Sequence, residues 1–301
     1  GIEDLFLDGA PAGFQAKDLI CLDYYNYMID QEGRVYKRTF TSNYLGGKYI
    51  NEPYQIDDKD MRVAFWGEGP VYPTADFLPA WDEKNGRIVM ISNSRTQNIY
   101  AVRDETEKDF MVSNMPEGTR VLYLLFKEAI WNDETWMYDG YSYNMIYNDA
   151  GGKTWLGEFV VGKDMDEKPL CTSVTVAPFP GGDVEENTLF IGTSSYSGPN
   201  ARIFYAKGNE IRYVERYAQV DRSYMTFQHE ITSLAFAAYA DWMSGLEPYK
   251  QIAVGFENGD FMLLDISNPD RPQIIEGATR NVGGKVVSVA QIGVNTHVIE
   301  N

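Results

Sequence analysis

Tryptophans that lie beside carboxylates are the residues of this chain best suited to chemistry, and that chemistry is recognition of a polar ligand. Aromatic rings stack on the apolar face of a sugar, while Asp, Glu and Asn side chains bind its hydroxyls. Segments 66–72, 128–136 and 241–249 combine the two kinds of side chain. The candidate binding residues in them are Trp66, Tyr72, Trp131, Asp133, Trp136 and Trp242. The alternative is that each tryptophan is buried and only fills space.

Acid–base catalysis is the second chemistry that these segments allow. A glycosidase needs two carboxylates about 5–10 Å apart, and Asp133, Glu134 and Asp139 are the candidates. The chain has 44 acidic residues, so closeness in sequence does not distinguish a catalytic pair from solvated charges. We therefore assign no catalytic residue, and we expect a binding protein rather than an enzyme.

Cofactor and metal chemistry have little support in the sequence. The only histidines are His229 and His297, and there is no His-x-x-x-His pair and no Gly-x-Ser-x-Gly elbow. The acidic stretches 57–60 and 164–167 would suit calcium by ligand type, but they lack the glycine and the distal glutamate of an EF-hand. We expect no cofactor and no metal site.

Charge and composition narrow the class of partner. The chain has 26 basic and 44 acidic residues, for a net charge of −18, which repels nucleic acid. No apolar run approaches the roughly 18 residues of a membrane span, so we expect no direct membrane insertion in this segment. Cys21 and Cys171 form no redox or metal motif, and buried free thiols are favoured over a disulfide.

The elements that must position these residues are repeated hairpins. Five times an apolar run stops at a polar turn that contains glycine and then resumes; the glycines are Gly33, Gly86, Gly152, Gly208 and Gly259. Glycine tolerates the positive φ that such turns need. Their spacings of 53, 66, 56 and 51 residues are typical of a β-propeller, a ring of small sheets called blades.

Uniformly apolar runs predict the innermost strand of each blade, because that strand is buried on both faces. They span 61–65, 120–126, 173–177 and 231–237, and a fifth run at 285–292 has no hairpin after it. We therefore predict an all-β protein, one domain over 1–301, with five four-stranded blades closed by the C-terminal strand. The predicted boundaries lie near residues 57, 110, 165 and 220. Six or seven blades are the alternative, and the Gly208 turn could join the third and fourth strands.

Inner strands all run in the same direction, so the loops that follow them should emerge on one face of the propeller. The loops 66–72, 128–136, 179–186 and 241–249 are expected there. This places the candidate tryptophans together, with segments 128–135 and 239–245 forming at most single helical turns within loops.

One segment resembles a known repeat. Residues Leu264–Gln273 contain Asp265, Ser267, Pro269 and Pro272 in the D-x-S-x-P-x-x-P spacing of LVIVD-type surface propellers of bacteria. The whole chain is similar to the C-terminal propeller portion of PKD-like bacterial lipoproteins, with aromatic and acidic stretches such as Asp23-Tyr24-Tyr25-Asn26. The resemblance implies an exported protein of the periplasm or cell surface, attached through a lipid anchor in a preceding segment and involved with glycans.

The sequence thus predicts a non-enzymatic binding module whose ligand is neutral and polar, such as a glycan. The alternatives are a glycosidase or lyase that uses loop carboxylates, and a scaffold that binds another protein.

Overall fold

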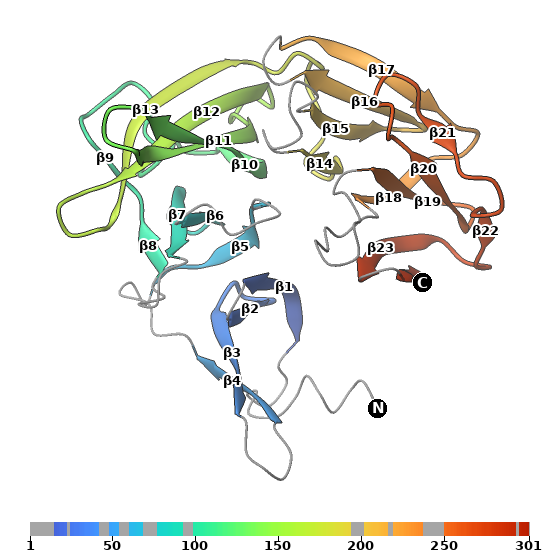
Figure 1. Cartoon of the computed structure of the whole chain (residues 1–301), viewed down its shortest axis with the longest axis horizontal. Helices are drawn as coiled ribbons and strands as arrows, with labels where there is room; N and C mark the ends of the chain where they lie inside the picture. Colours follow the sequence, from blue (N-terminus) through green and yellow to red (C-terminus); the bar gives the residue numbers. More distant parts are fainter. Residues whose placement is uncertain are drawn as a thin grey trace. The chain divides into compact units, whose positions relative to one another are not determined.

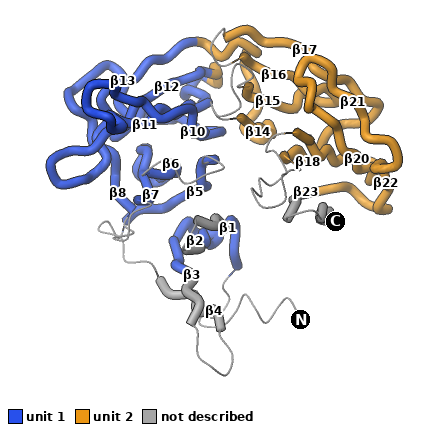
Figure 2. The backbone as a smooth tube through the Cα atoms, viewed as in Figure 1, with its two compact units in different colours: residues 1–151, 155–177 blue, residues 152–154, 178–301 orange. Residues whose placement is uncertain are grey.

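The structure of the chain is a computed structural model. It describes residues 15–22, 25–41, 48–53, 60–68, 77–92, 99–193, 202–215, 219–236, 250–292 and 295–300. Every regular element among them is a β-strand (Figure 1). The chain has two compact units, residues 1–151 with 155–177 and residues 152–154 with 178–301 (Figure 2), and each is described by itself.

Unit 1 contains three sheets in chain order, which are antiparallel apart from one short parallel pairing. The first is β1 (Ala16–Leu22), β2 (Tyr25–Asp30), β3 (Val35–Thr41) and β4 (Lys48–Pro53). The second is β5 (Val63–Trp66), β6 (Phe77–Asp82), β7 (Arg87–Ser92) and β8 (Ile99–Ala101). The third is β10 (Arg120–Asn132), β11 (Met137–Asn148), β12 (Thr154–Lys163) and β13 (Pro169–Pro178), with β9 (Arg103–Asp104) parallel to β13.

Unit 2 continues the pattern. Its first sheet is β14 (Phe190–Gly192), β15 (Arg202–Lys207), β16 (Glu210–Glu215) and β17 (Asp221–Thr226). The next is β18 (Ile231–Phe236), β19 (Gln251–Phe256), β20 (Asp260–Asp265) and β21 (Gln273–Ile274), with β22 (Arg280–Asn281) also paired to β20. The last sheet has two strands, β23 (Val286–Ile292) and β24 (Asn295–Glu300).

The five turn glycines behave as the sequence predicts. Their φ angles are 78° at Gly33, 60° at Gly86, 79° at Gly152, 61° at Gly208 and 87° at Gly259. Each lies between the second and third strands of its own sheet, including Gly208 between β15 and β16. Since residues with a side chain rarely adopt this backbone conformation, glycine marks the same turn in all five sheets.

Within each unit, successive sheets pack through shared apolar cores. Tyr27 and Ile29 of the first sheet are buried with Leu78 and Val89 of the second. A second core joins the second and third sheets, and a third core joins the β14–β17 sheet of unit 2 to the β18–β22 sheet. Small, mainly antiparallel sheets that follow one another along the chain in this way are the blades of a β-propeller fold, as predicted.

The inner strand predicted at 173–177 is wrong. Residues 173–177 lie in β13, the fourth strand of the third sheet, so the boundary near 165 moves past Pro178. In β13 exposed side chains, such as Thr175, alternate with partly buried ones, such as Val174 and Val176. That alternation is typical of a strand with one solvated face. The true first strand of the next sheet, β14, has only three residues and gives little signal in the sequence.

Three other expectations change. The run 285–292 is followed by a hairpin partner, β24, and the first sheet has four strands of its own. Residues 128–132 continue strand β10 instead of forming a loop. Segment 179–189 connects β13 to β14, so it follows a fourth strand and not an inner one.

Cys171 is a buried free thiol, as expected; the side chain of Cys21 lies outside the described residues.

Candidate ligand-binding site

The β10–β11 hairpin carries the largest exposed aromatic surface of the described residues. The two strands have 13 and 12 residues, longer than the other described strands. Their inner parts are buried, whereas the outer end is solvated. Here Trp131 is 46% exposed, Trp136 77%, Met137 64% and Tyr138 45%. The sequence places these side chains beyond the core because the strands extend past the residues that pack on the second sheet.

Asn132 organises the turn at the tip of the hairpin. Its side-chain oxygen accepts hydrogen bonds from the backbone N–H groups of Glu134 and Thr135, at 2.9 and 3.1 Å. Its Nδ2 donates to Oδ2 of Asp139 at 2.8 Å. The N–H of Trp136 donates to the carbonyl of Asn132 at 2.9 Å, which closes the turn. The tip is therefore held by its own hydrogen bonds.

Trp136 occupies this turn at a conformational cost. Its φ is 58°, in the left-handed region that costs a residue with a side chain about 1–2 kcal/mol. The exposed indole recovers little of that free energy by burial. Bulky residues in this conformation are rare and cluster at functional sites, so the strain itself motivates a functional hypothesis.

At the tip, the ring of Trp131 packs edge to face against two other rings. The centroids of Trp131 and Trp136 are 6.4 Å apart with an interplanar angle of 86°. Trp131 and Tyr138, which are partners across the two strands, are 5.0 Å apart at 74°. Tyr138 in turn lies 6.0 Å from Tyr141, whose ring reaches the core. The cluster is thus anchored at its base and open to solvent at its end.

The charge around these rings is negative. Residues 128–140 include four carboxylates and no lysine, arginine or histidine. Asp133, Glu134 and Asp139 are all exposed. Such a surface repels anionic ligands and leaves carboxylate oxygens available to accept hydrogen bonds from hydroxyl groups.

Of the six predicted binding residues, the structure brings together Trp131, Asp133 and Trp136. Trp66, by contrast, is only 8% exposed and lies at the end of β5, with its ring 6.4 Å from that of Tyr27 in the core. Trp66 is therefore buried and fills space, which is the alternative that the sequence left open for each tryptophan. Tyr72 and Trp242 lie outside the described residues.

Sequence reasoning missed Asn132 and Tyr138. Asn132 could have been found from its position four residues before Trp136, where an amide can cap a tight turn. Tyr138 could have been found by pairing the two strands, which places it opposite Trp131. Met137, the other exposed apolar side chain of the tip, was also missed.

A second polar cluster lies at the buried base of the hairpin, on β10, β11 and β12. The ammonium of buried Lys127 lies 2.8 Å from both carboxylate oxygens of Glu158. The hydroxyl of Ser142 donates to Oε1 of Glu158 at 2.9 Å. The carboxylate of Glu158 thus accepts hydrogen bonds from both the Lys127 ammonium and the Ser142 hydroxyl. This arrangement fits a structural ion pair better than an activated serine nucleophile.

The two acidic stretches that would suit calcium by ligand type are 57–60 and 164–167. Oδ1 of Asp164 accepts hydrogen bonds from the backbone N–H groups of Asp166 and Lys168, at 2.8 and 2.9 Å, and so caps its own turn. Residues 57–59 are outside the described part of the chain. Where the structure describes the chain, no group of three or more His, Cys, Asp or Glu side chains is arranged to hold a metal ion.

Comparison of the chain with protein-family models and with curated proteins gives no match. Across the described ranges, no helix has the length and apolar character needed to cross a membrane.

Proposed function

We propose that this chain is a non-enzymatic binding module that takes a neutral polar ligand, such as a glycan, on the outer end of the β10–β11 hairpin. The observation that carries the proposal is the strained and exposed indole of Trp136 beside Trp131 and Tyr138. An apolar sugar face can cover a ring while hydroxyls reach Asp133 or Asp139.

The enzymatic alternative fits this hairpin less well. Hydrolysis of a glycosidic bond needs two carboxylates that converge on the scissile bond from its two sides. Asp133, Glu134 and Asp139 instead lie exposed at the tip, and a carboxylate oxygen of Asp139 accepts a hydrogen bond from Asn132. We therefore favour binding over a glycosidase or lyase reaction.

A protein-interaction scaffold is the other alternative, and Met137 is the observation in its favour. Its exposed side chain extends the aromatic cluster with a flexible apolar group of the kind found on adaptable protein interfaces. The negative charge of the tip is compatible with a basic protein partner as well as with a sugar.

The cellular setting that we propose is export to the periplasm or the cell surface, with a lipid anchor in a preceding segment. It rests on the resemblance to LVIVD-type and PKD-like bacterial surface propellers. We propose further that five blades form the ring and that the C-terminal strands close it. The two-stranded sheet β23–β24 supports the alternative of a sixth blade.

The proposal is tested by intrinsic fluorescence during titration with a panel of soluble neutral glycans, with and without calcium. Trp66 and Trp81 are buried, so a ligand at the tip should change the emission of the exposed indoles. We expect saturation with one glycan and its loss in a folded Trp131→Ala variant. Saturation that Trp131→Ala leaves unchanged would contradict the assignment of the site. If no glycan of the panel changes the fluorescence, and a defined protein binds in a way that requires Met137, the protein-interaction scaffold is favoured.

A further inference from the structure

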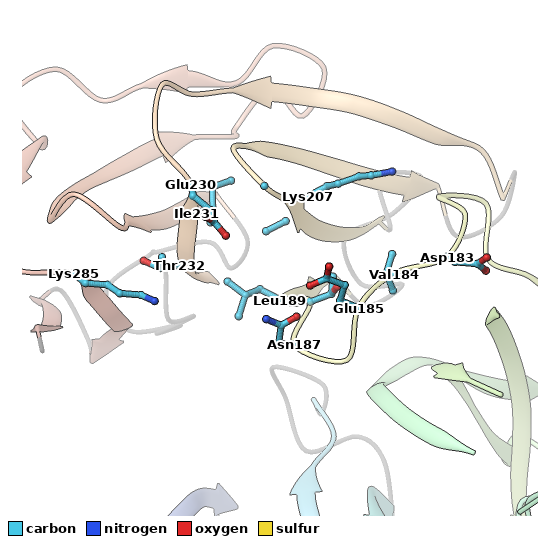
Figure 3. A pocket seen from close by; sticks show the side chains of 13 residues that line it. Asp183, Val184, Glu185, Asn187, Leu189, Lys207, Glu230, Ile231, Thr232 and Lys285 are labelled. Atoms are coloured by element: carbon cyan, nitrogen blue, oxygen red, sulfur yellow. The ribbon is translucent and has the colours of Figure 1, made fainter. Parts of the chain in front are cut away.

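Unit 2 contains a cleft that the proposed function does not use. It has a volume of about 460 Å³. Its walls come from the β13–β14 connection, the β15–β16 turn, the start of β18 and the residue before β23 (Figure 3). A volume of this size lies within the roughly 300–1,000 Å³ that small-molecule sites occupy.

Hydrogen bonds fasten these walls to one another. The N–H of Ala206 donates to the carbonyl of Leu189 at 3.0 Å, and that of Ile231 donates to the carbonyl of Gly208 at 3.0 Å. The hydroxyl of Thr232 donates to the carbonyl of Val286 at 2.5 Å, which fixes the segment that carries Lys285. The cleft is therefore preformed, so a ligand would bind without the cost of ordering its walls.

Five charged side chains line the cleft, two lysines and three carboxylates. Lys207 and Lys285 lie on different sides of it, and the carboxylates are those of Asp183, Glu185 and Glu230 (Figure 3). Oδ1 of Asp183 accepts a hydrogen bond from the backbone N–H of Thr154 at 2.9 Å. Within the described ranges, the side chains of Lys207, Lys285, Glu185 and Glu230 make no hydrogen bond and no ion pair. In a chain with an excess of 18 negative charges, two lysines that line one cleft without a carboxylate partner among the described residues are a distinctive feature.

The floor between these charges includes apolar side chains, beside the polar Asn187, Thr188 and Thr232. Ile231 is buried, and Val184 and Leu189 are partly buried at the lining. A ligand with charge of only one sign would leave either the lysines or the glutamates unmatched. A ligand with both signs and an aliphatic body matches the charges and the floor together.

We infer that this cleft binds a small zwitterion, namely an amino acid or a short peptide with free termini. Its carboxylate lies toward a lysine, Lys207 or Lys285, and its ammonium toward a glutamate, Glu185 or Glu230. Charge-assisted hydrogen bonds at both ends fix its orientation. This site lies in unit 2, apart from the hairpin of unit 1, and it does not depend on the proposed function.

Isothermal titration with leucine, alanyl-alanine and tri-alanine tests the inference, each also used in its N-acetylated and its C-amidated form. We expect saturable binding of at least one free form and binding about tenfold weaker for both blocked forms, because each block removes one charged hydrogen bond. Binding of leucine would identify free amino acids as the ligand, and binding of the peptides alone would identify peptide termini.

Matched variants locate the site. Lys207→Met, Lys285→Met, Glu185→Gln and Glu230→Gln probe the four lining charges that the inference assigns to the ligand. We expect about tenfold weaker binding when the charge that holds each end is lost. Lys250→Met and Glu276→Gln change charges that do not line the cleft, and Trp131→Ala changes the hairpin; all three should bind normally. The inference is overturned if no free form saturates up to about 1 mM, if blocking has no effect, or if the control variants weaken binding equally.

Discussion

The indole of Trp136 packs edge to face against that of Trp131, with centroids 6.4 Å apart, while the backbone of Trp136 is held at a φ of 58°. A glycine or an asparagine would occupy that backbone position at lower cost. The side chain that the chain retains there is instead one of its most exposed apolar groups. Binding of a ligand gives a physical reason for this combination.

Replacing Trp136 with asparagine should separate stability from binding. Asparagine tolerates the left-handed conformation, so we expect the free energy of unfolding to stay level or to rise by up to about 1 kcal/mol. Binding of the ligand should weaken at least about tenfold, since stacking of a ligand ring on one aromatic side chain contributes on the order of 1–3 kcal/mol to the free energy of binding. Urea denaturation and fluorescence titration measure the two effects. A loss of stability above about 1 kcal/mol would show that the indole packs as a structural residue.

A pair of equivalent turns in unit 1 offers a second comparison. Asp30 and Asp164 each accept hydrogen bonds at Oδ1 from backbone N–H groups two and four residues later. The fourth residue of the first turn is Gly33, with φ 78°, whereas that of the second is Glu167, with φ 60°. The same turn is thus built once with glycine and once with a strained glutamate.

Glu167→Asn should therefore stabilise the chain by roughly 0.5 kcal/mol, as the relieved strain exceeds the loss of an exposed ion pair to Lys163. The reciprocal change, Gly33→Ala, should destabilise by about 1–3 kcal/mol. A Cβ there would lie 3.0 Å from the backbone oxygen of Val63 as well as at positive φ. Thermal unfolding of both variants measures how each substitution changes stability. Equal effects on stability at the two turns would contradict the prediction.

Acid stability should depend on Asp30. Burial alone would raise its pKa, but hydrogen bonds from the Arg34 side chain and from the backbone N–H groups of Arg34 and Glu32 outweigh burial and hold the pKa below 3.8. A carboxyl whose pKa is lower in the folded state stabilises the fold above its unfolded-state pKa, and the contribution is lost as the pH falls through the folded-state value.

Asp30→Asn should accordingly cost about 1–3 kcal/mol near neutral pH, where the charged hydrogen bonds are complete. The difference between the variant and the original chain should shrink steadily below about pH 4. Urea unfolding from pH 7 to pH 2.5 measures this difference. A difference independent of pH would mean that shape, and not charge, is what Asp30 provides.

The segment Leu264–Gln273 has a structural role that its resemblance to a surface repeat does not reveal. Buried Arg202, from the preceding sheet of unit 2, donates to the carbonyl of Pro269 and to Oδ1 of Asp270, each at 2.6 Å. Its guanidinium also lies 4.2 Å from the centroid of the Tyr213 ring. The segment therefore connects two sheets of unit 2.

Arg202→Met should destabilise the chain by about 2–4 kcal/mol, because it removes a buried charge with two hydrogen bonds and a cation–π contact. The matched change Asp270→Asn should cost under about 1 kcal/mol, since the Asp270 side chain is mostly exposed. Denaturant unfolding compares the two, and an equal loss would show that the exposed carboxylate carries the contact.

The sequence predicted the turns well because their chemistry is local. Gly33, Gly86 and Gly259 each satisfy a backbone requirement that few other residues meet. It failed at β13 and β14, where strand identity depends on position within a sheet. A run such as 173–177 looks apolar on average, but whether it is innermost is decided by which strands it pairs with.

The site was predictable in residue type but not in exposure. Trp66 and Trp131 both come after apolar runs that predict inner strands, and both lie two residues before a carboxylate. The first ends a four-residue strand and packs near Tyr27, whereas the second lies on a 13-residue strand that extends past the core. Strand length and the neighbouring sheet decide between a buried and an exposed ring, and neither can be read from the local sequence.

The central claim is tested most directly by the indole N–H signals of the tryptophans in a ¹H–¹⁵N NMR spectrum, assigned by single substitutions and followed during glycan titration. The account predicts saturable shifts for Trp131 and Trp136, with Trp66 and Trp81 unmoved because they are buried. Saturable binding that leaves the Trp131 and Trp136 signals unchanged would contradict it.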